Sequence, residues 1–293
     1  MRKWLKMWSG REDSNLRPLP PEDVSPARIW RKTVGTAHLS VVNNAEYSRS
    51  VHGPRFKLNL EHCLTRSISR VVVVYTDPKG EHPDNKRFLK ECERWFGREI
   101  VVLSSRFYRD PWDVMLRERY IVGPDGAKCT GEMKRVLRFT FQRPDDIQVF
   151  GYTVEEKARA DRFRRENFEV YLETPLIDHG LTKADCKAMI REAGIEIPTM
   201  YRLGFQNNNC IGCPKGGMGY WNMIRQHFPE AFDRMAKIER EIGATCIKTV
   251  KEGRVFLDTL DPHRGNILTE PDIECSLMCH GSFAPEQQEA GGC

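Results

Sequence analysis

Short apolar runs alternate with longer stretches of helical periodicity through the middle of the chain. The apolar runs are rich in β-branched residues and predict strands at residues 71–76, 100–104, 147–151 and 170–172. Apolar residues recur at helical spacing between and after these runs and predict helices at residues 85–96, 132–141, 154–166 and 182–193. Strands alternating with helices predict an α/β fold, in which a doubly wound, mostly parallel sheet carries helices on both faces.

The C-terminal part of the chain has a different pattern. Residues 220–242 predict a long amphipathic helix, and Pro229 is expected to kink it or to divide it into two helices. Residues 247–250 and 255–257 predict a hairpin with Gly253 in its turn. The domains expected from these patterns are an irregular region at 1–64, an α/β domain at 65–200, a cysteine-bearing helical appendage at 201–283 and a disordered tail at 284–293.

Composition and net charge exclude few classes of function. The 293 residues carry a net charge of +5, which suits partners that bear phosphate and leaves nucleic acid open without requiring it. No stretch approaches the roughly 20 apolar residues that span a bilayer, so we expect a cytoplasmic protein without a membrane partner. Ten cysteines in such a protein indicate free thiols or metal ligands more than disulfides.

A polar loop follows the strand predicted at residues 71–76 and leads into a helix. It reads Tyr75-Thr76-Asp77-Pro78-Lys79-Gly80-Glu81-His82-Pro83-Asp84-Asn85. In open α/β sheets, ligands bind at the carboxyl ends of the strands, so the loop predicts a site for a polar ligand. An ordinary helix start is the alternative, because Asp84 can cap a helix and Pro83 often precedes one.

The segment Asp77-Pro78-Lys79-Gly80-Glu81-His82-Pro83 resembles a motif of the phosphoadenosine phosphosulfate reductase family. This family belongs to the adenine-nucleotide α-hydrolase-like enzymes that share a phosphate-binding "PP-loop", and its members commonly carry Asp-Thr-Gly-x-Glu-His-Pro after their second strand. The present chain has Pro78-Lys79 where the family has a threonine. The resemblance implies a nucleotide-binding fold whose ligand is ATP or phosphoadenosine phosphosulfate.

The resemblance continues downstream in two further segments. Cys129, Lys134 and Arg135 match a family stretch in which a cysteine or small residue precedes a helical lysine. Gly151 then matches a strand-ending glycine that leads to Glu-x-x-x-Arg, here Glu155 and Arg159. The nucleotide-binding residues implied by the resemblance are Asp77, Glu81, His82, Lys134, Gly151 and Arg159.

Plainer interpretations of these residues remain open. Lys134 and Arg135 could form a solvated helix face, and Glu155 with Arg159 could be a surface ion pair between successive helical turns. Thr182 and Asp185 match a further family segment, but they are most simply a helix cap.

The chain lacks a recognisable PP-loop. The segment Ser9-Gly10-Arg11-Glu12-Asp13-Ser14 imitates its pattern, but no hydrophobic strand precedes it and a proline-rich stretch follows. Where the loop is expected, residues 37–46 contain no glycine, although a loop that wraps phosphates needs positive φ and close approach of the backbone. We interpret the N-terminal region as degenerate, wrongly started or shifted in reading frame.

A Cys-x-x-Cys motif, Cys210-Ile211-Gly212-Cys213, lies in a glycine-rich turn and can place two sulfurs on one metal ion or cluster. The predicted ligands are Cys210, Cys213, Cys275 and Cys279, with Cys129 as an alternative and Cys186 as a further candidate. Zinc and an iron–sulfur cluster both suit four thiolates, and a redox-active dithiol is the chemical competitor. The motif is also similar to a subgroup of the family that is common in phage and mobile elements.

The resemblance implies oxidoreductase or sulfurtransferase chemistry. Either ATP adenylates a substrate that then receives sulfur, or a thiolate attacks a sulfonucleotide and releases sulfite, with a sulfur-donor or electron-donor protein as a possible partner. Sulfonucleotide-reducing members usually end in a Glu-Cys-Gly-x-His-like tail, of which only Glu274-Cys275 is present here. The alternative is a non-catalytic, metal-bound binding module, which the missing glycines favour.

Overall fold

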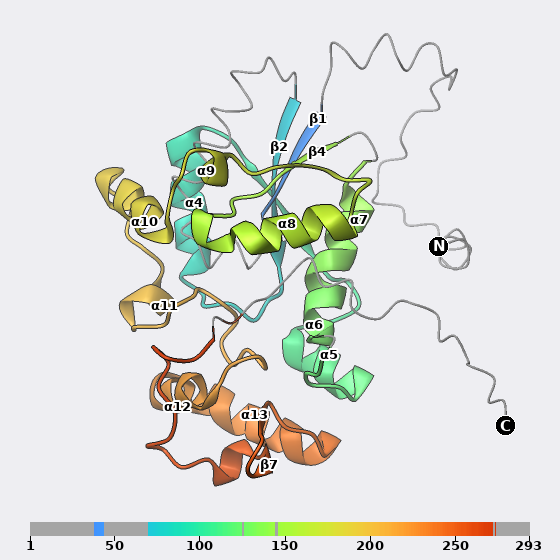
Figure 1. Cartoon of the computed structure of the whole chain (residues 1–293), viewed down its shortest axis with the longest axis vertical. Coiled ribbons are helices and arrows are strands. Elements are labelled where there is room, and N and C mark those ends of the chain that lie inside the picture. Colours follow the sequence, from blue (N-terminus) through green and yellow to red (C-terminus); the bar gives the residue numbers. More distant parts are fainter. Residues whose placement is uncertain (1–37, 44–69, 125, 144–145, 272, 274–293) are drawn as a thin grey trace, which may run out of the picture. The chain divides into compact units, whose positions relative to one another are not determined.

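In the computed structural model, one parallel sheet has the strand order β3-β2-β1-β4-β5 (Figure 1). Its strands are β1 His38–Asn43, β2 Arg70–Asp77, β3 Ile100–Ser104, β4 Ile147–Val149 and β5 Tyr171–Glu173. The structure describes residues 38–43, 70–124, 126–143, 146–271 and 273, all of which belong to the unit Ala37–Cys293. The four strands predicted from the sequence are confirmed, with ends that differ by at most two residues.

The central strand comes from a segment that the sequence pattern placed in the irregular region. β1 pairs with β2 from His38 opposite Arg70 to Asn43 opposite Tyr75, and on its other side it pairs with β4. The α/β fold therefore begins before residue 65. Residues 38–43 form the strand itself, and the residues that follow its carboxyl end lie outside the described ones. The predicted tail and the Ser9–Ser14 pattern lie outside them too.

Helices connect the strands, and Figure 1 shows α8 running across one face of the sheet. They are α4 Asn85–Phe96, α5 Pro111–Glu118, α6 Lys128–Thr130, the π-helical turn η1 Gly131–Arg135, α7 Val136–Phe141, the 3₁₀ turn η2 Val154–Glu156, α8 Lys157–Glu166, α9 Pro175–Asp178, α10 Lys183–Glu192 and α11 Thr199–Arg202. The helix predicted at 132–141 starts earlier and contains a π-helical turn. α5 was not predicted.

Local capping and packing explain two of these helices. Thr182 and Asp185 form the predicted capping box at the start of α10, where the Asp185 N–H donates to Thr182 Oγ1 (3.1 Å). α10 packs its buried Cys186 and Ile190 against α4 in one apolar cluster. Cys186 is therefore part of a packed core, which explains its burial without a metal.

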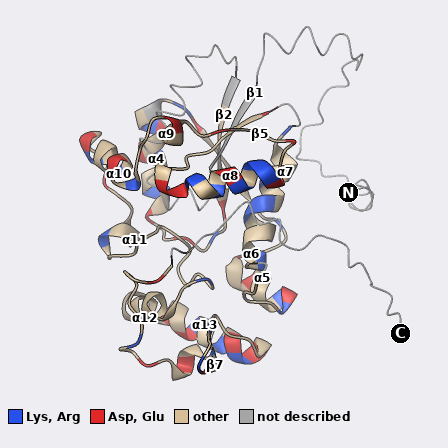
Figure 2. Cartoon of the chain, in the orientation of Figure 1, with Lys and Arg blue, Asp and Glu red and all other residues tan. Residues whose placement is uncertain are grey.

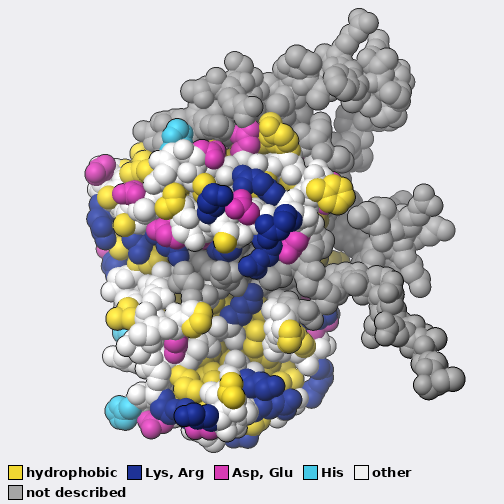
Figure 3. All heavy atoms as spheres, in the orientation of Figure 1, with side chains coloured by type: hydrophobic (Ala, Val, Ile, Leu, Met, Phe, Trp, Pro, Cys, Tyr) yellow, Lys and Arg dark blue, Asp and Glu magenta, His cyan; other side chains and the backbone are white. Residues whose placement is uncertain are grey.

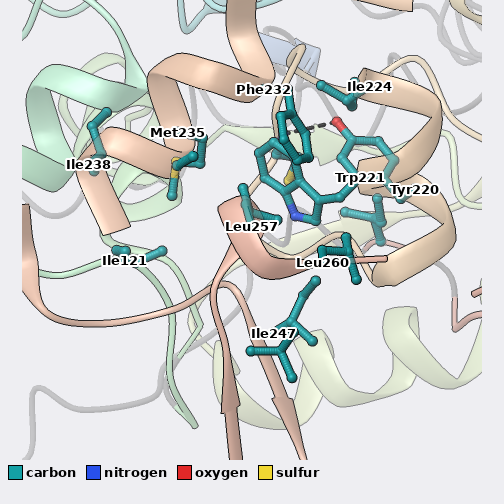
Figure 4. Packing of buried hydrophobic residues seen from close by; sticks show 14 of the residues in the cluster. Ile121, Tyr220, Trp221, Ile224, Phe232, Met235, Ile238, Ile247, Leu257 and Leu260 are labelled. Atoms are coloured by element: carbon teal, nitrogen blue, oxygen red, sulfur yellow. Dashed lines mark hydrogen bonds between the residues drawn. The ribbon is translucent and has the colours of Figure 1, made fainter. Parts of the chain in front are cut away.

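The C-terminal appendage packs in an apolar core that also includes Met115 of α5 and Ile121 (Figure 4). Its elements are α12 Met218–His227, α13 Pro229–Ile242, β6 Ile247–Thr249, β7 Gly253–Val255 and the 3₁₀ turn η3 Leu257–Thr259. Trp221, Met235 and Leu257 are fully buried there. Burying one such side chain stabilises the fold by about 1.5–3 kcal/mol, so the 220–242 pattern is explained by packing.

The structure refines the predictions for Pro229 and Gly253 in this appendage. Pro229 occupies the first turn of α13 and divides the predicted helix into two, since proline supplies no N–H to continue α12. Gly253 was predicted in the hairpin turn, but it is the first residue of β7 and pairs with Thr249 at φ +70°. None of the helices in the described ranges combines the length and the apolar character that crossing a membrane requires.

Candidate functional site

The carboxyl ends of β2 and β4 lie at the same edge of the sheet, because both strands run parallel to β1 between them. β2 ends at Asp77 and leads into the polar loop, whereas β4 ends at Val149 and leads to Gly151. The two segments that carry most of the predicted site therefore leave the sheet at one edge, two strands apart.

A tight turn fixes the beginning of the loop. The Lys79 N–H donates to Asp77 Oδ1 (2.7 Å), and Lys79 takes φ +57°, a left-handed conformation that is unfavourable for a lysine. Lys79 Nζ donates to the carbonyl oxygen of Ser105, just after β3 (3.2 Å). Gly80 follows, and a Cβ there would lie 2.9 Å from the Pro111 ring. The loop thus needs a residue without a side chain at Gly80.

Glu81 is the centre of a buried polar network. The Tyr75 hydroxyl donates to Glu81 Oε2 (2.5 Å), and Asn85 Nδ2 donates to the same oxygen (2.7 Å). Asn208 Nδ2 donates in turn to Asn85 Oδ1 (2.9 Å). On the other side of the carboxylate, Lys134 Nζ lies 3.8 Å from Oε1. One carboxylate therefore connects a strand end, a helix start, the cysteine-bearing segment and η1.

Burial governs the protonation of this network. It raises the pKa of Glu81, and the charge of Lys134 with the bonds from Tyr75 and Asn85 acts against that rise. Burial also raises the pKa of Tyr75, to which the negative charge of Glu81 adds. Lys134 is only 2% exposed, so the interpretation of this lysine as part of a solvated helix face is wrong. Its ammonium group and Glu81 form an internal ion pair.

His82 and Asp84 face the appendage and α11. His82 Nδ1 accepts the Asp84 N–H (3.1 Å), and its ring lies 5.8 Å from that of Phe228. Burial lowers the pKa of His82. The Asp84 carboxylate accepts from Arg87 and from the N–H and hydroxyl of Thr199, so it is not a side-chain cap of α4. Asp84 therefore occupies the N-cap position of α4, as the helix-start interpretation expects, but its side chain bonds Arg87 and Thr199 in place of the helix N–H groups.

Arg159 is paired, but with a different carboxylate from the one expected. Its Nη1 lies 2.6 Å from Glu156 Oε1, and both side chains are buried. Glu155 instead accepts the N–H of Lys183 (3.0 Å). The guanidinium of Arg159 also stacks over the Tyr152 ring at 5.3 Å. Arg159 therefore has a buried carboxylate partner in η2, just before α8, whose charges of both signs are visible in Figure 2.

The cysteine loop is joined to the polar loop by main-chain contact. The Ile211 N–H donates to the carbonyl of Gly80 (2.8 Å). Tyr220 Oη accepts the Cys213 N–H (2.9 Å) and donates to the carbonyl of Cys210 (3.0 Å), which holds both ends of the Cys-x-x-Cys turn. The predicted polar site and the predicted thiol site are therefore adjacent.

The structure describes some of the predicted cysteine ligands and not others. Cys275 and Cys279 lie outside the described residues. Cys246, which the sequence pattern did not single out, packs against the same apolar core as Cys129 and Cys213. Burial raises the pKa of Cys246, and the charges of Glu239, Cys213 and Cys129 add to the rise. Within the described ranges, no three or more His, Cys, Asp or Glu side chains are grouped to hold a metal ion.

Three members of the Glu81 network, Tyr75, Asn85 and Asn208, were not among the predicted site residues, although Tyr75 and Asn85 bound the predicted loop. Tyr75 occupies a strand position that reads as ordinary core, and Asn85 reads as a helix start. Asn208 had a weak signal, since three consecutive asparagines, all buried, precede Cys210. Buried amides need partners, so such a run beside a cysteine motif indicates a polar interior contact.

Charge on the visible surface does not single out one type of partner. Figure 3 shows basic and acidic side chains interspersed on the face in view. No protein-family model matches the chain, and no curated protein matches it. The residues and their geometry therefore carry the functional proposal.

Proposed function

We propose that this protein binds an adenine nucleotide at the carboxyl edge of its sheet, as a member of the phosphoadenosine phosphosulfate reductase family. The observation that carries the proposal is the buried pair of Glu81 and Lys134 beside the Asp77 loop, on the same edge as Gly151. Buried ion pairs stabilise folds poorly, so their retention in an interior favours a functional role.

The strand order supports a doubly wound sheet. The chain passes from β1 outwards to β2 and β3, then returns to the other side of β1 for β4 and β5. The direction of winding changes between β1 and β4. Ligands of open α/β sheets bind outside the strand ends at such a switch point, which lies between the Asp77 loop and Gly151.

Two reactions fit such a ligand. ATP could adenylate a substrate with release of pyrophosphate, after which incoming sulfur displaces AMP. Alternatively, a thiolate could attack the sulfur of a sulfonucleotide and displace its nucleotide phosphate, and a second thiol would then release sulfite from the cysteine S-sulfonate by forming a disulfide. In both, positive groups at the sheet edge stabilise the charge that develops on phosphate or sulfate oxygens. Zinc or an iron–sulfur cluster would be held by Cys210 and Cys213 with further thiols from the chain.

The competing proposal is a metal-bound module without catalysis. It is favoured by the sequence after β1, Asn44-Ala45-Glu46, which offers no glycine for wrapping a pyrophosphate. Glu81 and Lys134 oppose it, because a module without a ligand has no use for a buried ion pair at a strand end.

Calorimetry with ATP and with phosphoadenosine phosphosulfate tests nucleotide binding. We expect heat with one of them, and the nucleotide that binds selects between the two reactions. Asp77→Ala removes the acceptor that fixes the Lys79 turn and should weaken binding by about tenfold. Asp161→Ala, an exposed carboxylate on α8 that bonds Lys157, is the matched control and should leave the affinity unchanged. Absence of heat with both nucleotides would contradict the proposal.

Metal analysis of anaerobically purified protein tests the thiol site separately. We expect zinc, or iron with acid-labile sulfide, in the wild type and its loss in Cys213→Ser. Cys186→Ser, whose thiol is buried between α4 and α10, should keep the metal content of the wild type. Equal metal content in both variants, or none in the wild type, would remove the metal from the proposal and leave nucleotide binding untouched.

A further inference from the structure

Arg138 on α7 is fully buried, with 0% of its surface exposed. None of its three guanidinium nitrogens has a hydrogen-bond partner in the structure. No ion pair joins it to a carboxylate of the described residues. A guanidinium carries five N–H donors and a permanent charge, so such a position is highly unfavourable unless something else compensates it.

Aromatic rings surround this guanidinium. Its central carbon lies 4.2 Å from the ring centroid of Phe139, 5.5 Å from that of Phe163 and 6.0 Å from that of Phe150. Ring faces attract a cation but accept none of its N–H groups in the plane of the guanidinium. Burial lowers the pKa of Arg138 to about 10, with Tyr152 and Glu169 acting against the shift.

A second buried group nearby lacks partners as well. Gln148 is 1% exposed, and neither its amide oxygen nor its amide nitrogen is hydrogen-bonded. Gln148 is the middle residue of β4, and Phe150 directly follows the strand, immediately before Gly151. The Arg138 guanidinium lies 6.0 Å from the Phe150 ring, so both unsatisfied groups belong to the region where β4 ends.

The neighbouring cations differ from Arg138 in this respect. Lys134, one turn earlier on the same helical stretch, has Glu81 at 3.8 Å. Arg159 on α8 has Glu156 at 2.6 Å. Both residues that the sequence singled out are therefore compensated by carboxylates of the chain, while Arg138 is not.

We propose that Arg138 and Gln148 form a receptor for a phosphate or sulfate group at the Gly151 end of β4. The inference rests on the proposed function, because the group would belong to the nucleotide bound at this edge. A tetrahedral oxyanion satisfies a guanidinium through two parallel N–H bonds and can accept a further bond from an amide. Arg138, and not Arg159, then supplies the main positive charge for the anionic part of the ligand.

Phe139 provides the route of entry. Phe139 is 37% exposed, whereas Phe150 and Phe163 are buried. Of the three rings around the guanidinium, Phe139 is therefore the one that also faces solvent.

The test uses sodium sulfate and sodium phosphate as probes, with sodium chloride at equal ionic strength as reference. In the wild type, saturating sulfate or phosphate should raise the melting temperature by about 4 °C or more above the chloride reference. Sulfate and phosphate also stabilise folded proteins without binding, because they are excluded from the protein surface. Arg138→Met should therefore show a smaller rise than the wild type, and Arg138→Lys, which keeps the charge but not the two parallel N–H donors, should show an intermediate rise. Arg162→Met on α8, an exposed arginine, is the matched control and should behave like the wild type.

The outcomes separate this inference from nucleotide binding. If the nucleotide found by calorimetry binds Arg138→Met as tightly as wild type, the receptor proposal is overturned and the proposed function stands. If sulfate stabilises the wild type through Arg138 but no nucleotide binds, the receptor stands and the nucleotide proposal fails. Equal stabilisation of wild type and Arg138→Met by sulfate also overturns the receptor.

Discussion

Asp84 shows how one carboxylate can connect distant parts of this chain. Its oxygens receive hydrogen bonds from Arg87 on α4 and from Thr199 on α11. The bond from Arg87, with those from Thr199, lowers the pKa of Asp84 to about 2. The carboxylate therefore holds the start of α4 to α11 as long as it stays ionised.

This shift predicts an acid-dependent loss of stability. A carboxyl group whose pKa is lower in the folded than in the unfolded chain adds stability above its unfolded pKa of 3.8. That contribution disappears as the pH falls from about 4 towards 2. Asp84→Asn should flatten the pH dependence of urea midpoints in this window. Asp185→Asn, at an exposed cap, should change it less, and equal slopes for Asp84→Asn and wild type would contradict the assignment.

Lys79 offers a second residue-scale prediction. Its φ of +57° is a conformation that glycine adopts freely, and a side chain there costs about 1 kcal/mol or slightly more. Lys79→Gly should raise the free energy of unfolding by less than about 1 kcal/mol, because the loss of the Lys79 Nζ bond to Ser105 and the entropy gained by the unfolded chain both act against the gain. Lys86→Gly in α4 is the control, and it should lower that energy by about 1 kcal/mol. Urea denaturation of the three proteins measures both effects.

At the scale of elements, the glycine-rich segment before α12 is shaped by packing. Glu270 accepts the N–H groups of Gly219 and Tyr220 (2.5 and 3.1 Å), so an internal carboxylate already occupies the start of this helix. A Cβ on Gly217 would lie 2.5 Å from the carboxyl carbon of Glu270. The glycines let the chain around residue 265–270 approach, and a phosphate is not needed to explain them.

Gly219 provides the measurement. Its added Cβ would lie 2.4 Å from the backbone nitrogen of Ile267, which cannot move alone. Gly219→Ala should therefore destabilise the protein by about 2 kcal/mol or more, as overpacking does. In Gly131→Ala the Cβ meets only the flexible end of Arg135 at 3.2 Å, so thermal unfolding should change little. Similar melting temperatures for both variants would show that the segment packs less closely than described.

Helices and strands could be predicted from the sequence where a local residue pattern was sufficient to determine them. The valine run of β2 and the capping box of α10 depend on neighbours within a few residues, and both are found as predicted. α5 was missed although Asp110 caps it and Pro111 occupies its first position. No local sequence pattern indicated the π-helical turn that places Lys134 near Glu81. The contact of this turn is with a buried carboxylate in a distant segment of the chain.

At the scale of the whole molecule, the contacts that define the candidate site join segments far apart in the sequence. Asn85 and Asn208 are 123 positions apart, and no periodicity relates them. β1 was missed for a related reason, since its short run becomes a strand only between β2 and β4. The sequence could therefore indicate which segments carry the site, but not which side chains meet there.

The Asn208 contact predicts that the appendage and the sheet edge are coupled. Asn208→Leu removes the donor to Asn85 Oδ1 and leaves a buried acceptor unsatisfied, which costs about 1–3 kcal/mol. Hydrogen exchange should then show faster exchange at the start of α4 as well as in the cysteine loop. Asn222→Leu, which removes bonds to the carbonyls of Asp261 and Arg264, is the control and should affect the appendage alone. Unchanged exchange in α4 of the Asn208 variant would contradict the coupling.

The hydrogen bond between the Ile211 N–H and the Gly80 carbonyl differs from the side-chain contacts of the site, because it joins two backbone groups. Any residue except proline at position 211 can keep this link, whereas position 80 is restricted to glycine by the nearby Pro111 ring. Insertions, a proline at position 211, or separate expression of the two regions are the changes that break it. Lineages could thus exchange the chemistry of the thiol loop freely while inheriting its attachment to the strand end.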